Sequence, residues 1–290
     1  DYLSLFLFWE IMAFASTFLI WCNRAEKDAT AAGFRYLLVH TFGGLLLLSG
    51  FVLRYQATGS IAFELLDYET STAYNWLIMS GLMLNAAVVP LHSWLPDAYS
   101  KATIGGAVFM CAFTTKTAVY TLARACAGFE ILIVLGVAMA VYGIVYAIIE
   151  NDIRRLLGWE IISQVGYMVA GVGIGTALAI NGAAAHAFAH ILYKGLLFMG
   201  AGAVIQMTGK SRFTEHSGLI DEQRVYDRLS QVFGDRSFAD CQLPLYLVSE
   251  HGIDRNVANT LIAFSRMPSV LMAFIAGWAT DRIGPRRTLK

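Results

Sequence analysis

Long, uninterrupted apolar stretches are the feature that most constrains this chain. A helix needs about 20 mostly apolar residues to cross the ~30 Å hydrocarbon core of a bilayer. The sequence contains eight such stretches, and they are continuously apolar rather than alternating, which favours helices over strands. We therefore predict an all-α, polytopic transmembrane helix bundle with spans at about 3–22, 34–53, 74–91, 104–124, 130–149, 155–174, 179–207 and 257–279.

The composition supports the same class of protein. Hydrophobic residues make up 57% of the chain and charged residues 14%, whereas a soluble domain carries roughly 25% charged residues. This scarcity of charge excludes an ordinary cytosolic enzyme and a disordered protein. The 21 basic and 21 acidic residues balance, so no net charge attracts nucleic acid. The four cysteines form no CxxC motif, and we expect neither a metal site nor a cofactor.

The lysines and arginines between the predicted spans are concentrated in alternate loops, those after the first, third, fifth and seventh spans. Because basic residues are enriched in cytoplasmic loops, we predict that these loops are cytoplasmic and that the N-terminus faces out. The expected location is the inner (plasma) membrane. An apolar span begins within three residues of Asp1, and we interpret the chain as a piece of a longer protein.

The density of charge rises sharply after Gly209. We therefore divide the chain into a transmembrane domain at 1–209, a charged cytoplasmic linker at 210–237 and a transmembrane hairpin at 238–290. The first crossing of that hairpin is short for a bilayer, so we expect it to be strained or only partly inserted.

Several ionisable residues fall inside the predicted spans, where each costs a few kcal/mol and marks a functional site by default. Glutamate, lysine and histidine can each bind and release a proton, so together they predict a proton pathway through trapped water. Three of these residues are spaced four apart, which places them on one helical face that we expect to point into the protein. The candidates are Glu10, His40, Lys116 and the row of His186, His190 and Lys194.

A structural role is the alternative for each candidate. A lone histidine such as His40 is more often a packed, hydrogen-bonded side chain, and the other groups could form ion pairs that only join helices. Buried ion pairs rarely repay their desolvation, which favours function. Arg35 and Glu160 lie near the ends of predicted spans, and we interpret them as reaching the membrane interface.

Five motifs occur in order along the chain, at residues 88–98 (VVPLHSWLPDA), 115–120 (TKTAVY), 151–157 (NDIRRLL), 162–167 (ISQVGY) and 186–198 (HAFAHILYKGLLF). Together they resemble the antiporter-like membrane subunits of respiratory complex I and the D-type subunits of Mrp cation/proton antiporters. The resemblance covers about residues 1–219. It implies a fold of inverted helical repeats with broken helices at the repeat centres, of which this chain would hold an incomplete copy.

The resemblance also implies roles for single residues. Glu10 matches the essential glutamate of the family, Lys116 its connecting lysine, His190 its histidine, and Lys194 a lysine that some members carry. Asn85 stands where the family usually has a lysine that partners the glutamate. The glutamate–lysine pair of the first half is therefore incomplete in this chain.

The C-terminal segment resembles a different family. Residues 277–287 (GWATDRIGPRR) are similar to the cytoplasmic loop between paired helices of major facilitator superfamily carriers. The alternative is that the basic residues are simply a cytoplasmic anchor. The residues that carry this gate-like motif are Gly277, Asp281, Arg282, Gly284, Arg286 and Arg287.

These observations predict a proton- or cation-translocating subunit, or a segment of one, in an Mrp-type antiporter or a complex-I-like module. H+ is the expected ion and Na+ the other candidate. Any redox reaction would belong to partner membrane subunits, so the chain is at most the ion-translocating part of an NADH:quinone oxidoreductase. The alternatives are a facilitator-type solute transporter, which rests on the C-terminal motif alone, and an inert truncated or fusion fragment.

Overall fold

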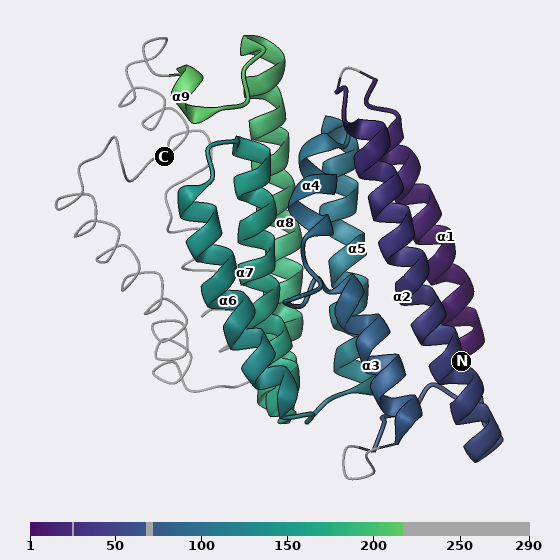
Figure 1. Ribbon diagram of the computed structural model, residues 1–290. Coiled ribbons are helices and arrows are strands. Elements are labelled where there is room, and N and C mark those ends of the chain that lie inside the picture. The colour runs from purple at the N-terminus through teal and green to yellow at the C-terminus, as the bar shows by residue number, and fades with distance from the viewer. Residues whose placement is uncertain (25, 68–71, 217–290) are drawn as a thin grey trace, which may run out of the picture. The chain divides into compact units, whose positions relative to one another are not determined.

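The computed structural model describes residues 1–24, 26–67 and 72–216, and the chain divides into two units, Asp1–Ser211 and Arg212–Lys290. The first unit is a bundle of helices that run alongside one another (Figure 1). The predicted all-α bundle is confirmed. The helices of this unit are α1 (Tyr2–Trp21), α2 (Ala29–Thr58), α3 (Ala73–Asn85), α4 (Trp94–Lys101), α5 (Ile104–Ala125), α6 (Ile131–Ile149), α7 (Ile153–Ile174) and α8 (Ala177–Thr208), and α9 (Phe213–His216) follows in the second.

Five helices of the described part, α1, α2, α6, α7 and α8, are long and apolar enough to cross a membrane. Their outer faces carry large apolar side chains, among them Phe8, Val134 and Phe188, which are 72%, 70% and 69% exposed. A continuous apolar surface of this kind marks contact with lipid or with other membrane subunits. It fits the predicted multi-pass membrane protein.

The predicted span at 74–91 is wrong as a single helix. α3 ends at Asn85, and α4 begins only after a non-helical turn. Pro90 lacks the N–H that a helix interior needs and disfavours helical backbone in the residue before it, and Ala87 has a positive φ of 56°. The 13 residues of α3 extend for about 20 Å at 1.5 Å per residue, too short to cross a bilayer. α3 and α4 lie one beyond the other and both pack against α5 (Figure 1).

The break between α3 and α4 is enclosed by protein. Ala86, Ala87 and Val88 are at most 2% exposed. The indole Nε1 of Trp94 donates a hydrogen bond to the carbonyl oxygen of Leu84 at 3.1 Å. Non-helical backbone at membrane depth is tolerated only where protein or water satisfies it, so this tryptophan helps to stabilise the break.

Small residues let α6 and α7 approach each other closely. A Cβ added at Gly136 would lie 2.6 Å from the carbonyl oxygen of Gly166. The Ser163 hydroxyl donates across the same interface to the carbonyl oxygen of Ala140 at 2.8 Å. Close backbone contact and interhelical hydrogen bonds replace the hydrophobic effect as the force that joins helices in lipid.

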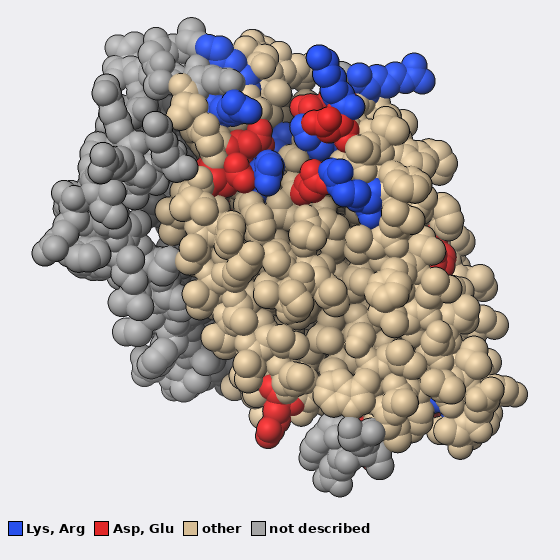
Figure 2. Space-filling view, viewed as in Figure 1, with Lys and Arg blue, Asp and Glu red and all other residues tan. Residues whose placement is uncertain are grey.

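Charged side chains gather at one end of the bundle (Figure 2), where the α1–α2, α4–α5 and α6–α7 connections lie. Two ion pairs tie α4 to its surroundings there. Lys101 contacts Glu26 of the α1–α2 connection at 3.0 Å, and Arg35 of α2 pairs with Asp97. These connections are among those predicted to be cytoplasmic, and that orientation stays a prediction.

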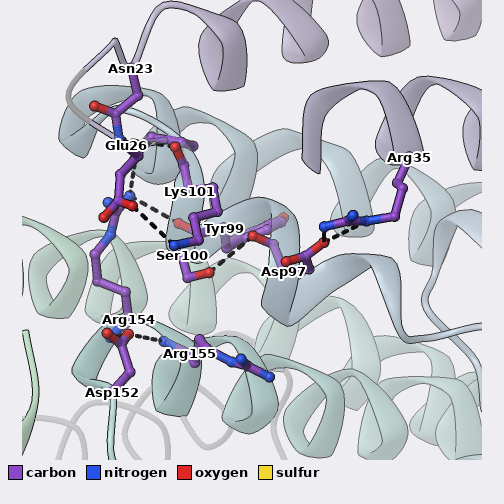
Figure 3. Close-up of polar contacts among 11 residues, drawn as sticks. Asn23, Glu26, Arg35, Asp97, Tyr99, Ser100, Lys101, Asp152, Arg154 and Arg155 are labelled. Carbon is purple, nitrogen blue, oxygen red and sulfur yellow. Dashed lines mark hydrogen bonds and ion pairs between the residues drawn. The ribbon is translucent and has the colours of Figure 1, made fainter. Parts of the chain in front are cut away.

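A buried arginine fixes the corner between α4 and α5 (Figure 3). Arg154 begins the first turn of α7 and is only 7% exposed. Its Nη2 donates to the carbonyl oxygens of Tyr99 at 2.9 Å and Ala102 at 2.6 Å. Asp152 caps α7 by accepting from the backbone N–H of Arg154 and Arg155. The corner is therefore held both by the start of α7 and by the α1–α2 connection, where the Asn23 amide donates to the carbonyl oxygens of Lys101 and Ala102 at 3.0 and 3.1 Å.

Candidate ion pathway in the bundle interior

Glu10 lies at the middle of α1, with its carboxylate against α2. One carboxylate oxygen, Oε1, is buried without a hydrogen-bond partner among the described residues. A Cβ added at Gly44 of α2 would overlap this oxygen. The absence of a side chain at position 44 therefore makes the space that Glu10 occupies.

Asn85 reaches the same part of α2 from the other side. It is the last residue of α3 and is 1% exposed. Its amide nitrogen lies 3.2 Å from the position of a Cβ on Gly43, and it donates weakly to the carbonyl oxygen of Gly81 at 3.4 Å. Glu10 and Asn85 thus contact consecutive glycines of one helix. Asn85 supplies no positive charge to the neighbourhood of Glu10.

His40 sits one turn away from Gly44 on the same side of α2 and is 1% exposed. Its ring stacks on Tyr36 with centroids 3.8 Å apart and meets Trp94 edge-on at 4.4 Å. Nδ1 lies 2.9 Å from the carbonyl oxygen of Tyr36, while Nε2 has no partner among the described residues. This close packing fits a structural role for His40. Its Nε2 is nevertheless buried without a hydrogen-bond partner among the described residues.

Lys116 lies in the middle of α5 and is 6% exposed. Its ammonium group has one polar contact in the described residues, Cys111 Sγ at 3.9 Å. No carboxylate of the described residues pairs with it. The lysine is close enough to interact electrostatically with His186, His190 and Lys194 of the neighbouring helix α8.

In the row of His186, His190 and Lys194 on α8, two of the three residues face the protein interior, as expected. His190 and Lys194 are fully buried, and His186 is half-buried. The two imidazole rings have centroids 6.2 Å apart. Both ring nitrogens of His190 and Nε2 of His186 lack hydrogen-bond partners among the described residues. A neutral imidazole has one nitrogen that can accept a proton or a hydrogen bond, so both rings keep this capacity.

Glu160 is a further charged residue beside this interior, with a partner that the interpretation from sequence did not include. Its carboxylate forms an ion pair with Lys194, which joins α7 to α8. Glu160 lies seven residues into α7, about 10 Å along the helix at 1.5 Å per residue. The same depth argument that selects Glu10 would have selected it.

The gate-like motif at 277–287 lies outside the described residues and stays a prediction, as does the hairpin at 238–290. Within the described residues, no group of three or more histidine, cysteine or acidic side chains could hold a metal ion.

Comparison with known proteins shows the family. Residues 1–248 match the family described as "NADH:quinone oxidoreductase/Mrp antiporter, TM", so the chain belongs to this family of membrane subunits. The match extends past residue 219, where the resemblance read from the motifs ends. Over 238 residues, the chain is 33% identical to an NADH-quinone oxidoreductase subunit of Desulforudis audaxviator and 32% identical to a Na(+)/H(+) antiporter subunit of Alkalihalophilus pseudofirmus.

These alignments cover 76% of this chain but 47% and 48% of the two relatives, so the chain spans about half of their length. Two solved structures of membrane complexes contain chains with the same fold. The Mrp complex from Dietzia sp. matches with a TM-score of 0.65 and 33% identity over 72% of this chain and 25% of that chain. An archaeal membrane-bound sulfane sulfur reductase matches with a TM-score of 0.67 and 25% identity, covering 74% of this chain and 47% of that one.

Proposed function

We propose that this chain is part of a proton-translocating membrane subunit of an Mrp-type antiporter or a complex-I-like module. One observation carries the proposal: Lys116 and His190 are buried near the middle of α5 and α8 without an oppositely charged partner among the described residues, where ionisable groups are too costly to persist without a use. The matched relatives include a Na(+)/H(+) antiporter subunit and an NADH-quinone oxidoreductase subunit. We assign H+ as the ion that moves, with Na+ as the alternative.

The pathway would have two parts. Glu10 and Lys116 would carry the proton in the first part, and His186, His190 and Lys194 in the second, with internal water bridging the gaps. His40 lies beside the first part and has a free nitrogen that could receive a proton. Asn85 cannot hold a charge, so the first part works without the opposite charge that a lysine there would supply.

The proposal also implies partners and a location. The matched solved structures are multisubunit membrane complexes, and we propose that this chain works with other membrane subunits in the inner (plasma) membrane. Those subunits would supply the energy that drives transport. Purification of the chain under mild detergent should recover them together with it.

The test is proton flux in proteoliposomes that hold the complete complex, followed with a pH-sensitive dye. Glu10→Gln removes a proton-binding group from the bundle interior, and we expect most of the flux to be lost. Glu130→Gln is the matched control, because Glu130 is exposed at the start of α6 and makes no capping hydrogen bond. Equal flux in these two variants would refute the assignment of Glu10 to the pathway.

A further inference from the structure

Glu160 and Lys194 form an ion pair between α7 and α8. Lys194 belongs to the proposed pathway, whereas Glu160 does not. Lys194 is fully buried, and 27% of the Glu160 side chain is exposed. The pair joins α7 to α8, two helices that pack along each other. The carboxylate is thus the accessible end of a pair whose other end is sealed inside the protein.

The surroundings of this pair hold an excess of proton-binding groups over carboxylates. Lys116 on α5 interacts electrostatically with Lys194, yet its ammonium group contacts only Cys111 Sγ among the described residues. His190 lies one turn from Lys194 on α8, with both ring nitrogens unpartnered. Lys194 therefore has one carboxylate partner, while Lys116 and His190 beside it have none among the described residues. The charge of Glu160 acts directly on Lys194 and, through it, affects where protons reside in the group.

We infer that Glu160 is a residue of the ion pathway and controls the proton on Lys194; this inference rests on the proposed function. A proton that arrives from the exposed side binds a carboxylate oxygen of Glu160, and the attraction that holds Lys194 charged is lost. One N–H bond of the Lys194 ammonium then breaks and an N–H bond forms on a free nitrogen of His190. One proton is taken up and one is passed on, and the added positive charge resides on His190, where the nearby Lys116 ammonium group repels it.

The neighbours of the pair fit this step. Tyr193 of α8 lies close enough to Glu160 to interact with its charge, and its ring meets that of His190 edge-on with centroids 5.0 Å apart. Lys116, on the opposite helix, is within electrostatic range of His190. The residues that would release, receive and repel the proton are therefore grouped on α5, α7 and α8.

The experiment compares Glu→Gln variants in the complete complex, using the same proteoliposome assay. Glu160→Gln keeps the shape of the side chain but removes its charge and its basic oxygen. We expect the flux to fall at least roughly fivefold, the lower range for energetic coupling between sites. Glu160→Asp keeps a carboxylate and should retain most of the flux. Glu130→Gln is again the control that should change nothing.

A second variant separates a pathway role from a structural one. Glu160→Gln combined with Lys194→Gln removes both charges, so the complex should regain thermal stability that the single variant loses through its unpaired lysine. Its flux should stay low. Recovery of flux in this double variant, or normal flux in Glu160→Gln, would overturn the inference.

The Glu10→Gln variant keeps this test distinct from that of the proposed function. If Glu10→Gln abolishes flux while Glu160→Gln does not, only the role of Glu160 is refuted. If both variants retain full flux, the proposed function fails and the inference fails with it.

Discussion

Gly44 determines where the Glu10 carboxylate can lie, because a Cβ at position 44 would overlap its oxygen. We predict that Gly44→Ala costs little stability, because the atoms that the new Cβ meets are the end of the flexible Glu10 side chain, which can move away. The same change should displace Glu10 and reduce proton flux. Thermal unfolding in detergent and the flux assay measure the two effects.

Gly182→Ala is the matched control for this substitution. Gly182 lies inside α8 with no atom within 4 Å of an added Cβ. Alanine is favoured over glycine in a helix by about 1 kcal/mol, so its stability should be equal or higher and its flux unchanged. If Gly44→Ala behaves like Gly182→Ala, the contact between Gly44 and Glu10 has no functional consequence.

Asn85→Lys should restore the opposite charge that the first part of the pathway lacks. A lysine there can reach the region of Glu10 past Gly43, and the two charges should attract each other. We predict a favourable coupling of about 0.5–3 kcal/mol between Glu10 and the new lysine, the usual range for interacting residues. Thermal stabilities of Asn85→Lys, Glu10→Gln and the double variant measure this coupling, and additive effects would refute it.

At the level of residues, sequence predicted the buried groups better than their partners. The depth of Lys116, His190 and Lys194 inside apolar runs correctly predicted their burial. The partner of Lys194 was missed, because the predicted span began at 155 and placed Glu160 too near its end. An ion pair between two helices also depends on how the helices rotate against each other, which periodicity within one helix does not determine.

Among the helices, the corner between α4 and α5 is stabilised in part by Arg154 of α7. Arg154→Gln would leave the carbonyl oxygen of Tyr99 without its side-chain donor, whereas that of Ala102 would keep the Asn23 amide at 3.1 Å. An unsatisfied buried polar group costs about 1–3 kcal/mol. We predict a clear loss of thermal stability of that size. Arg155→Gln is the control, since Arg155 is exposed and only pairs with Glu150 at 3.2 Å, a surface contact worth at most about 1 kcal/mol.

Equal losses of stability in Arg154→Gln and Arg155→Gln would contradict this account of the corner.

The break between α3 and α4 shows a limit of sequence analysis. Hydropathy extended the span to residue 91, because the residues around Pro90 are apolar. The family resemblance did predict broken helices, and Pro90 was the local signal for this one.

For the whole molecule, the described unit holds its two sets of ionisable groups in different states. In the first set Glu10 lacks a lysine, because position 85 is asparagine. In the second set Lys194 has Glu160 as its partner. A half-length match to the curated relatives leaves the activity of the complete protein as a proposal. The described unit thus holds an oppositely charged pair in its second set and an unpaired carboxylate in its first.

The thermal stability and proton flux of Lys116→Met, measured on the same purified complex, test the central claim most directly. The claim is that the buried ionisable groups conduct protons rather than hold helices together. Lys116 has no carboxylate partner among the described residues, so an apolar side chain of similar length should leave stability equal or higher. We predict that flux falls to the background level while Lys27→Met, at an exposed lysine, changes neither quantity. Full proton flux in Lys116→Met would contradict the account.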